Sequence, residues 1–183
     1  MSSTTKFELP ASGLAEEILA GFVAQAQEEA DLEVERAAEE QRENFHLVTF
    51  GLGQECYGVP IESVQEIIRA GGITRVPGAP RHVRGVINLR GRIIPVVDLR
   101  KRLGFPELES SEEQRVMVVE LGAKRLGMLV DSVAQVIRVP AALVEEIPEE
   151  AVSIDEKYLL GVGKLEEGLV FIIDLSRSLM LSL

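Results

Sequence analysis

Tryptophan is absent from this 183-residue chain, aromatic residues make up only 4 %, and cysteine occurs once, at Cys56. A single cysteine excludes an internal disulfide and is typical of a protein in a reducing cytosol. With so few aromatic side chains, the core must be aliphatic. No apolar run reaches about 18 residues, which argues against membrane insertion, and the N-terminal residues lack the basic flank and apolar core of a signal peptide.

Patterns of catalysis and metal binding are also missing. The two histidines, His46 and His82, are not near a serine or cysteine in any arrangement for nucleophilic catalysis. No cysteine pair, histidine pair or carboxylate cluster has metal-ligand spacing. Gly161-Val162-Gly163 lacks the third glycine and the following helix of a dinucleotide site. We therefore expect no enzyme, no cofactor and no metal.

What the chain does contain is an internal repeat. Residues 83–104 (VRGVINLRGRIIPVVDLRKRLG) predict two strands joined by a tight turn at Gly91, then a short helix that ends at Gly104. Residues 160–179 align with residues 84–103 without a gap, and residues 126–137 match residues 57–68. A double match in the same order indicates two tandem copies of one small β-rich unit.

The spacing of apolar residues and turns predicts five short strands in each copy. The expected strands are 46–53, 55–60, 63–69, 84–89 and 92–98 in the first copy, and 115–121, 124–130, 132–138, 159–165 and 168–173 in the second. Short strands with close turns favour a mainly β fold of two five-stranded barrels or curled sheets, each with a terminal helical turn. We expect subdomains at about 45–106 and 107–183.

Residues 1–44 precede this pattern and form a separate extension. Leu14, Ile18 and Phe22 recur every four residues, which predicts a helix of roughly 15 to 30 residues within 11–43. Its first half is amphipathic and its second half is rich in glutamate. The apolar face can pack on the body, self-associate or dock on a partner, and the sequence does not choose among these.

Charge is unevenly distributed along the chain. The net charge is −11, with a local balance of −8 in residues 1–44 and +7 in residues 70–106. A concentrated basic segment in an acidic protein suggests a docking surface for an acidic partner. Nucleic-acid binding is an alternative for a small β-barrel, but the net charge and the few aromatic residues weaken it.

The hairpin tip differs between the copies. The first copy has Asn88-Leu89-Arg90-Gly91 where the second has Lys164-Leu165-Glu166-Glu167, although the framework residues around them are retained. A tip that differs between copies is free to be specialised, so Arg90 is the first functional candidate. Its planar guanidinium suits a carboxylate, and we hypothesise that it pairs with Glu66 across adjacent strands.

The run GVINLRGRIIPVVDLRKRLG, preceded by VPGAP and YGVPIESVQEII, closely resembles the CheW family of chemotaxis coupling proteins. The resemblance covers about residues 45–182. It implies two SH3-like five-stranded barrels and a non-enzymatic cytoplasmic adaptor at chemoreceptor arrays. The implied partners are the tips of methyl-accepting chemotaxis receptors and the regulatory domain of a CheA-type histidine kinase.

The resemblance also implies two sets of site residues. Those expected at the receptor are Val64, Glu66, Gly85, Asn88, Arg90 and Gly91. Those expected at the kinase, on apolar edges of the second barrel, are Leu126, Gly127 and Leu165. Core and turn duty is an equally good explanation for Val64 and Gly85.

Overall fold

The computed structural model describes residues 12–148 and 154–179. The chain divides into two compact units, Met1–Arg42 and Glu43–Leu183. This division lies near the boundary expected after residue 44. The two units are described separately below.

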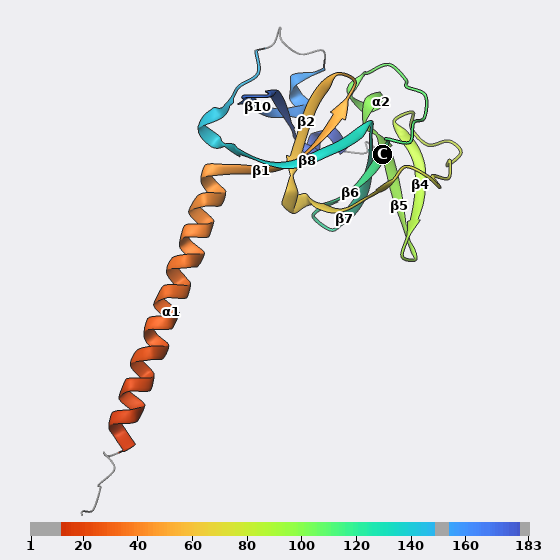
Figure 1. The fold of residues 1–183 in the computed structure, drawn as a ribbon. Helices are drawn as coiled ribbons and strands as arrows, with labels where there is room; N and C mark the ends of the chain where they lie inside the picture. The colour runs from red at the N-terminus through yellow and green to blue at the C-terminus, as the bar shows by residue number, and fades with distance from the viewer. Residues whose placement is uncertain (1–11, 149–153, 180–183) are drawn as a thin grey trace, which may run out of the picture. The chain divides into compact units, whose positions relative to one another are not determined.

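The described part of the first unit is a helix, α1, which runs from Ser12 to Glu43 over 32 residues (Figure 1). It is slightly longer than the roughly 15 to 30 residues predicted, because alanine, glutamate, glutamine and leucine dominate this segment and all favour helix. Its large apolar side chains are exposed. Among the described residues, no helix is long and apolar enough to cross a membrane.

The second unit is built from strands and three-residue to five-residue helices, so the expected mainly β fold class is confirmed. Its strands are β1 (Asn44–Leu52), β2 (Glu55–Pro60), β3 (Val64–Arg69), β4 (Val83–Leu89), β5 (Arg92–Asp98), β6 (Arg115–Leu121), β7 (Lys124–Val130), β8 (Ser132–Pro140), β9 (Val144–Glu145), β10 (Leu159–Leu165) and β11 (Gly168–Ile173). The α-helices are α2 (Leu99–Leu103) and α3 (Leu175–Leu179). The 3-10 turns are Ile61–Ser63, Ala141–Leu143 and Glu156–Tyr158.

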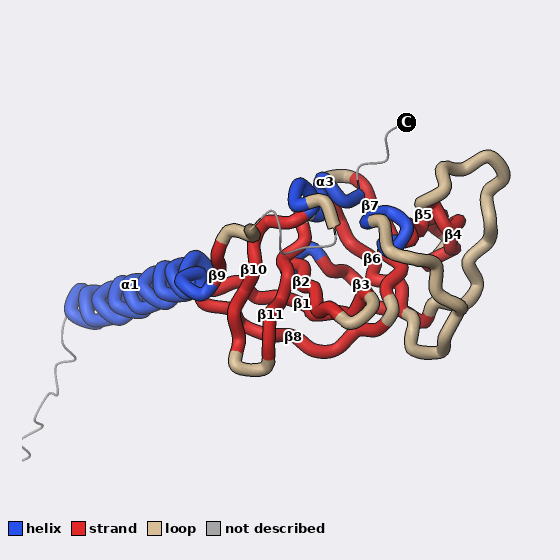
Figure 2. The backbone as a smooth tube through the Cα atoms, turned by 90° about the horizontal axis from the view of Figure 1, so that it is seen from above, coloured by secondary structure: helices blue, strands red, loops and turns tan. Residues whose placement is uncertain are grey.

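These strands form two sheets that exchange hairpins between the repeats (Figure 2). Sheet A has the order β8-β1-β2-β11-β10-β9, and sheet B has the order β3-β6-β7-β5-β4. The β1–β2 hairpin of the first repeat is therefore inserted between strands of the second, and the β6–β7 hairpin is inserted between strands of the first. The sheets therefore do not follow the expected division at residue 106, because each sheet takes strands from both sides of it.

The two sheets are equivalent in register as well as in order. Strand β2 runs parallel to β11 with Gly58 opposite Ile172, and β7 runs parallel to β5 with Gly127 opposite Val96. A Cβ atom would lie 3.0 Å from Leu47 at Gly58, and 2.7 Å from Val116 at Gly127. The repeated glycine is thus needed where the inserted hairpin packs against its neighbours.

Sheet A has one more strand than expected. The two-residue strand β9 pairs with β10, with Glu145 opposite Val162. Its counterpart in sheet B is the single bridge between Thr74 and Val86 at the edge of β4. The segment at this position in the first repeat is rich in glycine and proline, which prevents a longer strand.

The repeated aspartates begin the short helices. The Asp98 side chain accepts a hydrogen bond from Lys101 N at 3.2 Å, and Asp174 accepts one from Arg177 N at 3.1 Å. Such N-caps satisfy backbone donors at a helix start. The leucines that follow are buried in the largest core cluster: Leu99, Leu103, Leu175 and Leu179. The helices α2 and α3 lie side by side (Figure 2), and Arg102 Nε donates to Ser178 O at 2.9 Å.

Glycine is required at position 85 because the backbone of Thr74 lies very close to it. This close approach leads to a prediction about stability. The φ of Gly85 is +151°, and a Cβ atom would lie 2.1 Å from Thr74 O, which belongs to the backbone. We expect Gly85→Ala to lower the free energy of unfolding by at least about 2 kcal/mol, because Thr74 must move away from Val86. Urea denaturation measures the change.

Gly71→Ala is the matched control, because nothing lies within 4 Å of its added Cβ. It should alter the free energy of unfolding by no more than about 0.5 kcal/mol. Equal stability of the two variants would contradict the close approach.

Candidate functional site

The tip of the β4–β5 hairpin is held in an uncommon backbone conformation. Arg90 has φ +52° and Gly91 has φ +80°, the pair of positive values found in a type I′ turn. Arg90 is the only non-glycine residue with positive φ in the described part of the chain. An L-residue costs about 1 kcal/mol in this region. Asn88 supports the turn, because its Oδ1 accepts a hydrogen bond from Gly91 N at 3.0 Å.

The hypothesised contact between Arg90 and Glu66 is present. Arg90 Nη2 lies 3.1 Å from Glu66 Oε1, with the two side chains 81 % and 28 % exposed. The expected route across adjacent strands is wrong, because Glu66 is on β3 and the hairpin begins with β4, the two outer strands of sheet B. The ion pair therefore joins the two edges of the sheet, which must curl strongly to bring them together.

Beside this ion pair is a depression of about 280 Å³, which we call the basic groove. Three arginines and one glutamate dominate its lining. The residues are Gln65, Glu66, Leu89, Arg90, Arg92, Ile94, Val118 and Arg125. It is an exposed, positively charged surface suited to a partner that carries carboxylates.

Sheet A carries an equivalent depression of about 630 Å³, which we call the apolar groove. In the repeat alignment, each residue that lines the basic groove is equivalent to a residue that lines the apolar groove. These are Ala134, Gln135, Leu165, Glu166, Gly168, Val170, Thr49 and Cys56, in the same order. Gln135 and Glu166 replace Glu66 and Arg90, so no ion pair joins the sheet edges here. Burial raises the pKa of the Cys56 thiol, which favours its neutral form.

The other predicted site residues have mixed outcomes. Val64 is half-buried against the largest core cluster, and Gly85 is buried at the bulge beside Thr74. These positions agree with the alternative explanation, in which Val64 serves the core and Gly85 serves the backbone conformation. Leu126 and Gly127, expected at an apolar edge of the second barrel, are buried in β7, an inner strand of sheet B.

Leu165 is the one kinase-side candidate near a surface. It lines the apolar groove and packs on the cluster of Leu47, Val139, Val170 and Ile172. The alternation of side chains along a strand does not by itself show which face of the sheet is exposed. The fold, not the repeat, decides which face is exposed.

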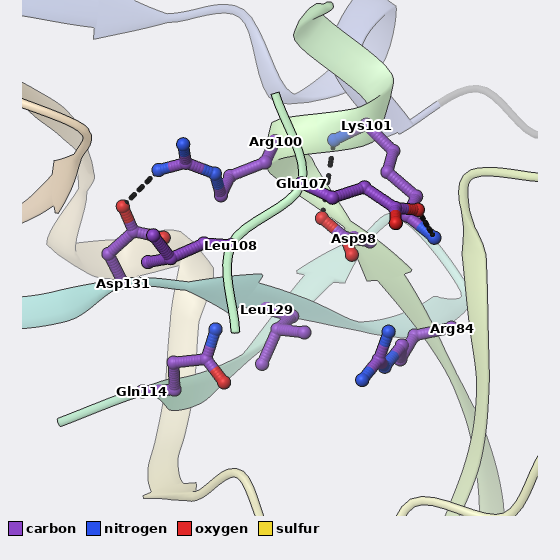
Figure 3. A pocket seen from close by; sticks show the side chains of 9 residues that line it. All are labelled: Arg84, Asp98, Arg100, Lys101, Glu107, Leu108, Gln114, Leu129 and Asp131. Carbon is purple, nitrogen blue, oxygen red and sulfur yellow. Dashed lines mark hydrogen bonds and ion pairs between the residues drawn. The ribbon is translucent and has the colours of Figure 1, made fainter. Parts of the chain in front are cut away.

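An ion pair that was not predicted from the sequence joins Arg100 and Asp131 at the junction of the two sheets (Figure 3). Their side chains are only 11 % and 15 % exposed. Asp131 Oδ2 also accepts a hydrogen bond from Gly53 N at 2.8 Å, while Arg100 Nε donates to Pro106 O at 2.9 Å. The pair thus joins α2, the β7–β8 junction and the β1–β2 turn.

A signal for this pair did exist in the repeat alignment. The positions equivalent to Arg100 and Asp131 are Ser176 and Glu62, so the arginine occurs in one copy only, while an acidic side chain is present in both. Charged residues that depart from a repeated framework are candidates for a contact that the repeat does not explain. Their distance in sequence hid the pairing.

The same junction holds the acidic connector after α2. Glu107 Oε1 lies 2.6 Å from Lys101 Nζ. The hydrogen bond from Lys101 lowers the pKa of Glu107, and the charges of Lys101, Arg81 and Arg84 lower it further. In the described residues, no group of histidine, cysteine or carboxylate side chains is arranged to hold a metal ion.

Comparison with known proteins agrees with this architecture. Residues 46–181 match the family model of the CheW-like domain. Chemotaxis protein CheW from Klebsiella aerogenes is 36 % identical over 133 residues, which cover 73 % of this chain and 80 % of that protein. Chemotaxis protein CheW from Treponema pallidum is 34 % identical over 139 residues, with 74 % and 82 % covered.

A solved structure gives the same result. The scaffolding protein TtCheW from Thermoanaerobacter tengcongensis superposes with a TM-score of 0.69 at 34 % identity, covering 75 % of this chain and 89 % of that one. The fold is that of a scaffolding protein. The chain belongs to the CheW-like family and is a chemotaxis scaffold protein. A scaffold role is consistent with the expectation that the chain is not an enzyme, and none of these relatives supports nucleic-acid binding.

The buried ion pair generates a stability prediction. We expect Asp131→Leu to lower the free energy of unfolding by about 3 kcal/mol, because Arg100 is left largely buried without its charge partner. Adding Arg100→Met should recover part of this loss, since no buried charge then remains. Urea denaturation of the single and double variants measures both effects.

Glu62→Leu is the control, because Glu62 is the exposed repeat equivalent of Asp131. It should change stability by no more than about 0.5 kcal/mol. A loss at Asp131 no larger than that at Glu62 would show that the pair does not join the sheets.

The exposed ion pair leads to a smaller effect. A double-mutant cycle with Glu66→Ala and Arg90→Ala should give a coupling energy between about 0.2 and 1 kcal/mol, because Arg90 is mostly in solvent. The coupling should shrink in about 1 M salt, which screens exposed charges. No coupling at low salt would mean that the two side chains do not pair in solution.

Proposed function

We propose that this scaffold couples the tips of chemoreceptors to the regulatory domain of a CheA-type histidine kinase. The observation that carries the proposal is the pair of equivalent grooves with different chemistry. One small protein that binds two different partners needs two surfaces, and the repeat supplies two frames whose linings have diverged.

The basic groove is the proposed receptor site, with Glu66, Asn88, Arg90 and Gly91 at the contact. Arg90 presents its guanidinium from a turn that Asn88 stabilises. Glu66 holds that guanidinium at the sheet edge, which reduces the ordering cost of binding. Val64 and Gly85 act indirectly in this proposal, by shaping the strands that carry the tip.

The apolar groove is the proposed kinase site. Leu165 and Val170 form its apolar lining, and Leu169, which is 51 % exposed, lies at its rim. Exposed apolar side chains beside a cavity are typical of a protein-binding surface. This replaces Leu126 and Gly127 with neighbours of Leu165 as the contact residues. The location that follows is the cytoplasmic side of chemoreceptor arrays.

A pull-down with separate partners tests the proposal. Wild type should bind both the kinase regulatory domain and a receptor signalling fragment. Arg90→Glu should retain the kinase and weaken receptor recruitment at least tenfold, about 1.4 kcal/mol, because a carboxylate then faces an acidic partner. Leu169→Glu should show the opposite selectivity.

Arg81→Glu is the charge-matched control for Arg90→Glu, since Arg81 is exposed and lines neither groove. It should retain both partners. If Arg81→Glu weakened receptor binding as strongly as Arg90→Glu, general charge and not the hairpin tip would explain the effect. If wild type bound neither partner, the coupling function itself would be wrong.

A further inference from the structure

The long helix α1 lies outside the segment that matches the CheW-like domain, and it carries an exposed apolar face. Five large side chains in its first half are between 54 % and 68 % exposed: Leu14, Ile18, Leu19, Phe22 and Val23. At about 100° per residue, these five and the small residues Ala15 and Ala26 fall within one half of the helix circumference. The face is continuous over residues 14–26.

Charge divides the same helix into two halves. Residues 18–27 (ILAGFVAQAQ) contain no charged side chain. Residues 28–43 contain eight acidic and two basic side chains, a local balance of −6. Glu16 and Glu17 are the only charged residues within the segment 14–26 that carries the apolar face, and the strongly acidic segment follows it directly toward β1.

We propose that α1 pairs with α1 of a second copy of this chain, in antiparallel orientation, through residues 14–26. An antiparallel pair centred between Leu19 and Phe22 places Leu19 of each copy beside Phe22 of the other, with Ala15 beside Ala26. Small residues at the ends let the helices approach closely while large ones fill the centre.

The charge distribution selects the antiparallel orientation. In a parallel pair, the acidic halves of both copies would run side by side over about 24 Å, at 1.5 Å per residue. Like charges at that spacing repel. In the antiparallel pair, the acidic segments 28–43 point away from each other, and Glu16 and Glu17 of each copy lie beside the uncharged Gln25 and Ala24 of the other. Binding of α1 to an anionic membrane surface is disfavoured as well, because the acidic segment 28–43 would be repelled by the lipid head groups.

The size of the interface sets its strength. An overlap of 13 residues is about 20 Å long, and it buries less than the roughly 1,200 Å² of a stable protein complex. Association should therefore be weak and concentration-dependent, and should strengthen where copies are held close together, as on a shared assembly.

Sedimentation equilibrium of the full chain tests the proposal. Between about 10 and about 500 µM, the range expected for an interface of this size, the average mass should rise from that of a monomer toward that of a dimer. Leu19→Asp with Phe22→Asp should keep the chain monomeric throughout. A monomer at every concentration of wild type would overturn the proposal.

Ala20→Asp with Gln27→Asp is the matched control, because it adds the same two charges on the opposite side of α1. This variant should still dimerise at least half as tightly as wild type. If both double variants lost the dimer equally, helix destabilisation rather than the apolar face would be responsible. If neither did, the dimer would use another surface, and the proposal would be wrong.

Spin labels test the orientation separately. With Cys56→Ala as background, a label at Glu39→Cys should give inter-copy distances of about 55 Å in the antiparallel pair, because residue 39 is far from its centre. A label at Ala24→Cys should give distances below about 25 Å. Short distances at residue 39 would show a parallel pair and refute the assignment.

Discussion

Insertion of each hairpin between strands of the other repeat is the constraint on which the rest of the structure depends. Strands β1 and β2 are held by β8 and β11, and β6 and β7 are held by β3 and β5. Neither repeat has a complete sheet without the other. The inserted strands pack closely enough that a Cβ atom at Gly58 or Gly127 would crowd a neighbouring side chain. The ion pair of Arg100 with Asp131 joins α2 to the β7–β8 junction, beside the β1–β2 turn.

This exchange explains how one protein obtains two related but distinct surfaces. Each hairpin tip meets an edge strand from its own repeat and an inner strand from the other. Glu66 and Arg90 form an ion pair at this position in sheet B, while the equivalent residues in sheet A, Gln135 and Glu166, have no opposite charges to pair. The backbone frame is shared because the glycines, leucines and capping aspartates are shared. The side chains that line the two grooves differ between the copies, and these differences give the grooves their different chemistry.

Much of the fold was predictable because it rests on local signals. Strand positions followed from short apolar runs, the two short helices followed from leucines four residues apart, and Asp98 and Gly104 mark the start and end of α2. The contact of Glu66 with Arg90 was also anticipated from chemistry alone. The inner position of Leu126 and Gly127 in sheet B was not predictable, because a strand that is buried on both faces does not reveal its neighbours.

By itself, the sequence determined the element types, the tandem repeat, the family and the extended helix with its neutral and acidic halves. These depend on spacing, capping and composition within about twenty residues. Only the tertiary structure decided which strands are neighbours, that Glu66 and Arg90 join opposite edges of one sheet, and that Arg100 reaches Asp131. Pairing between distant strands depends on how the curled sheets pack as a whole, and the local spacing of residues does not predict it.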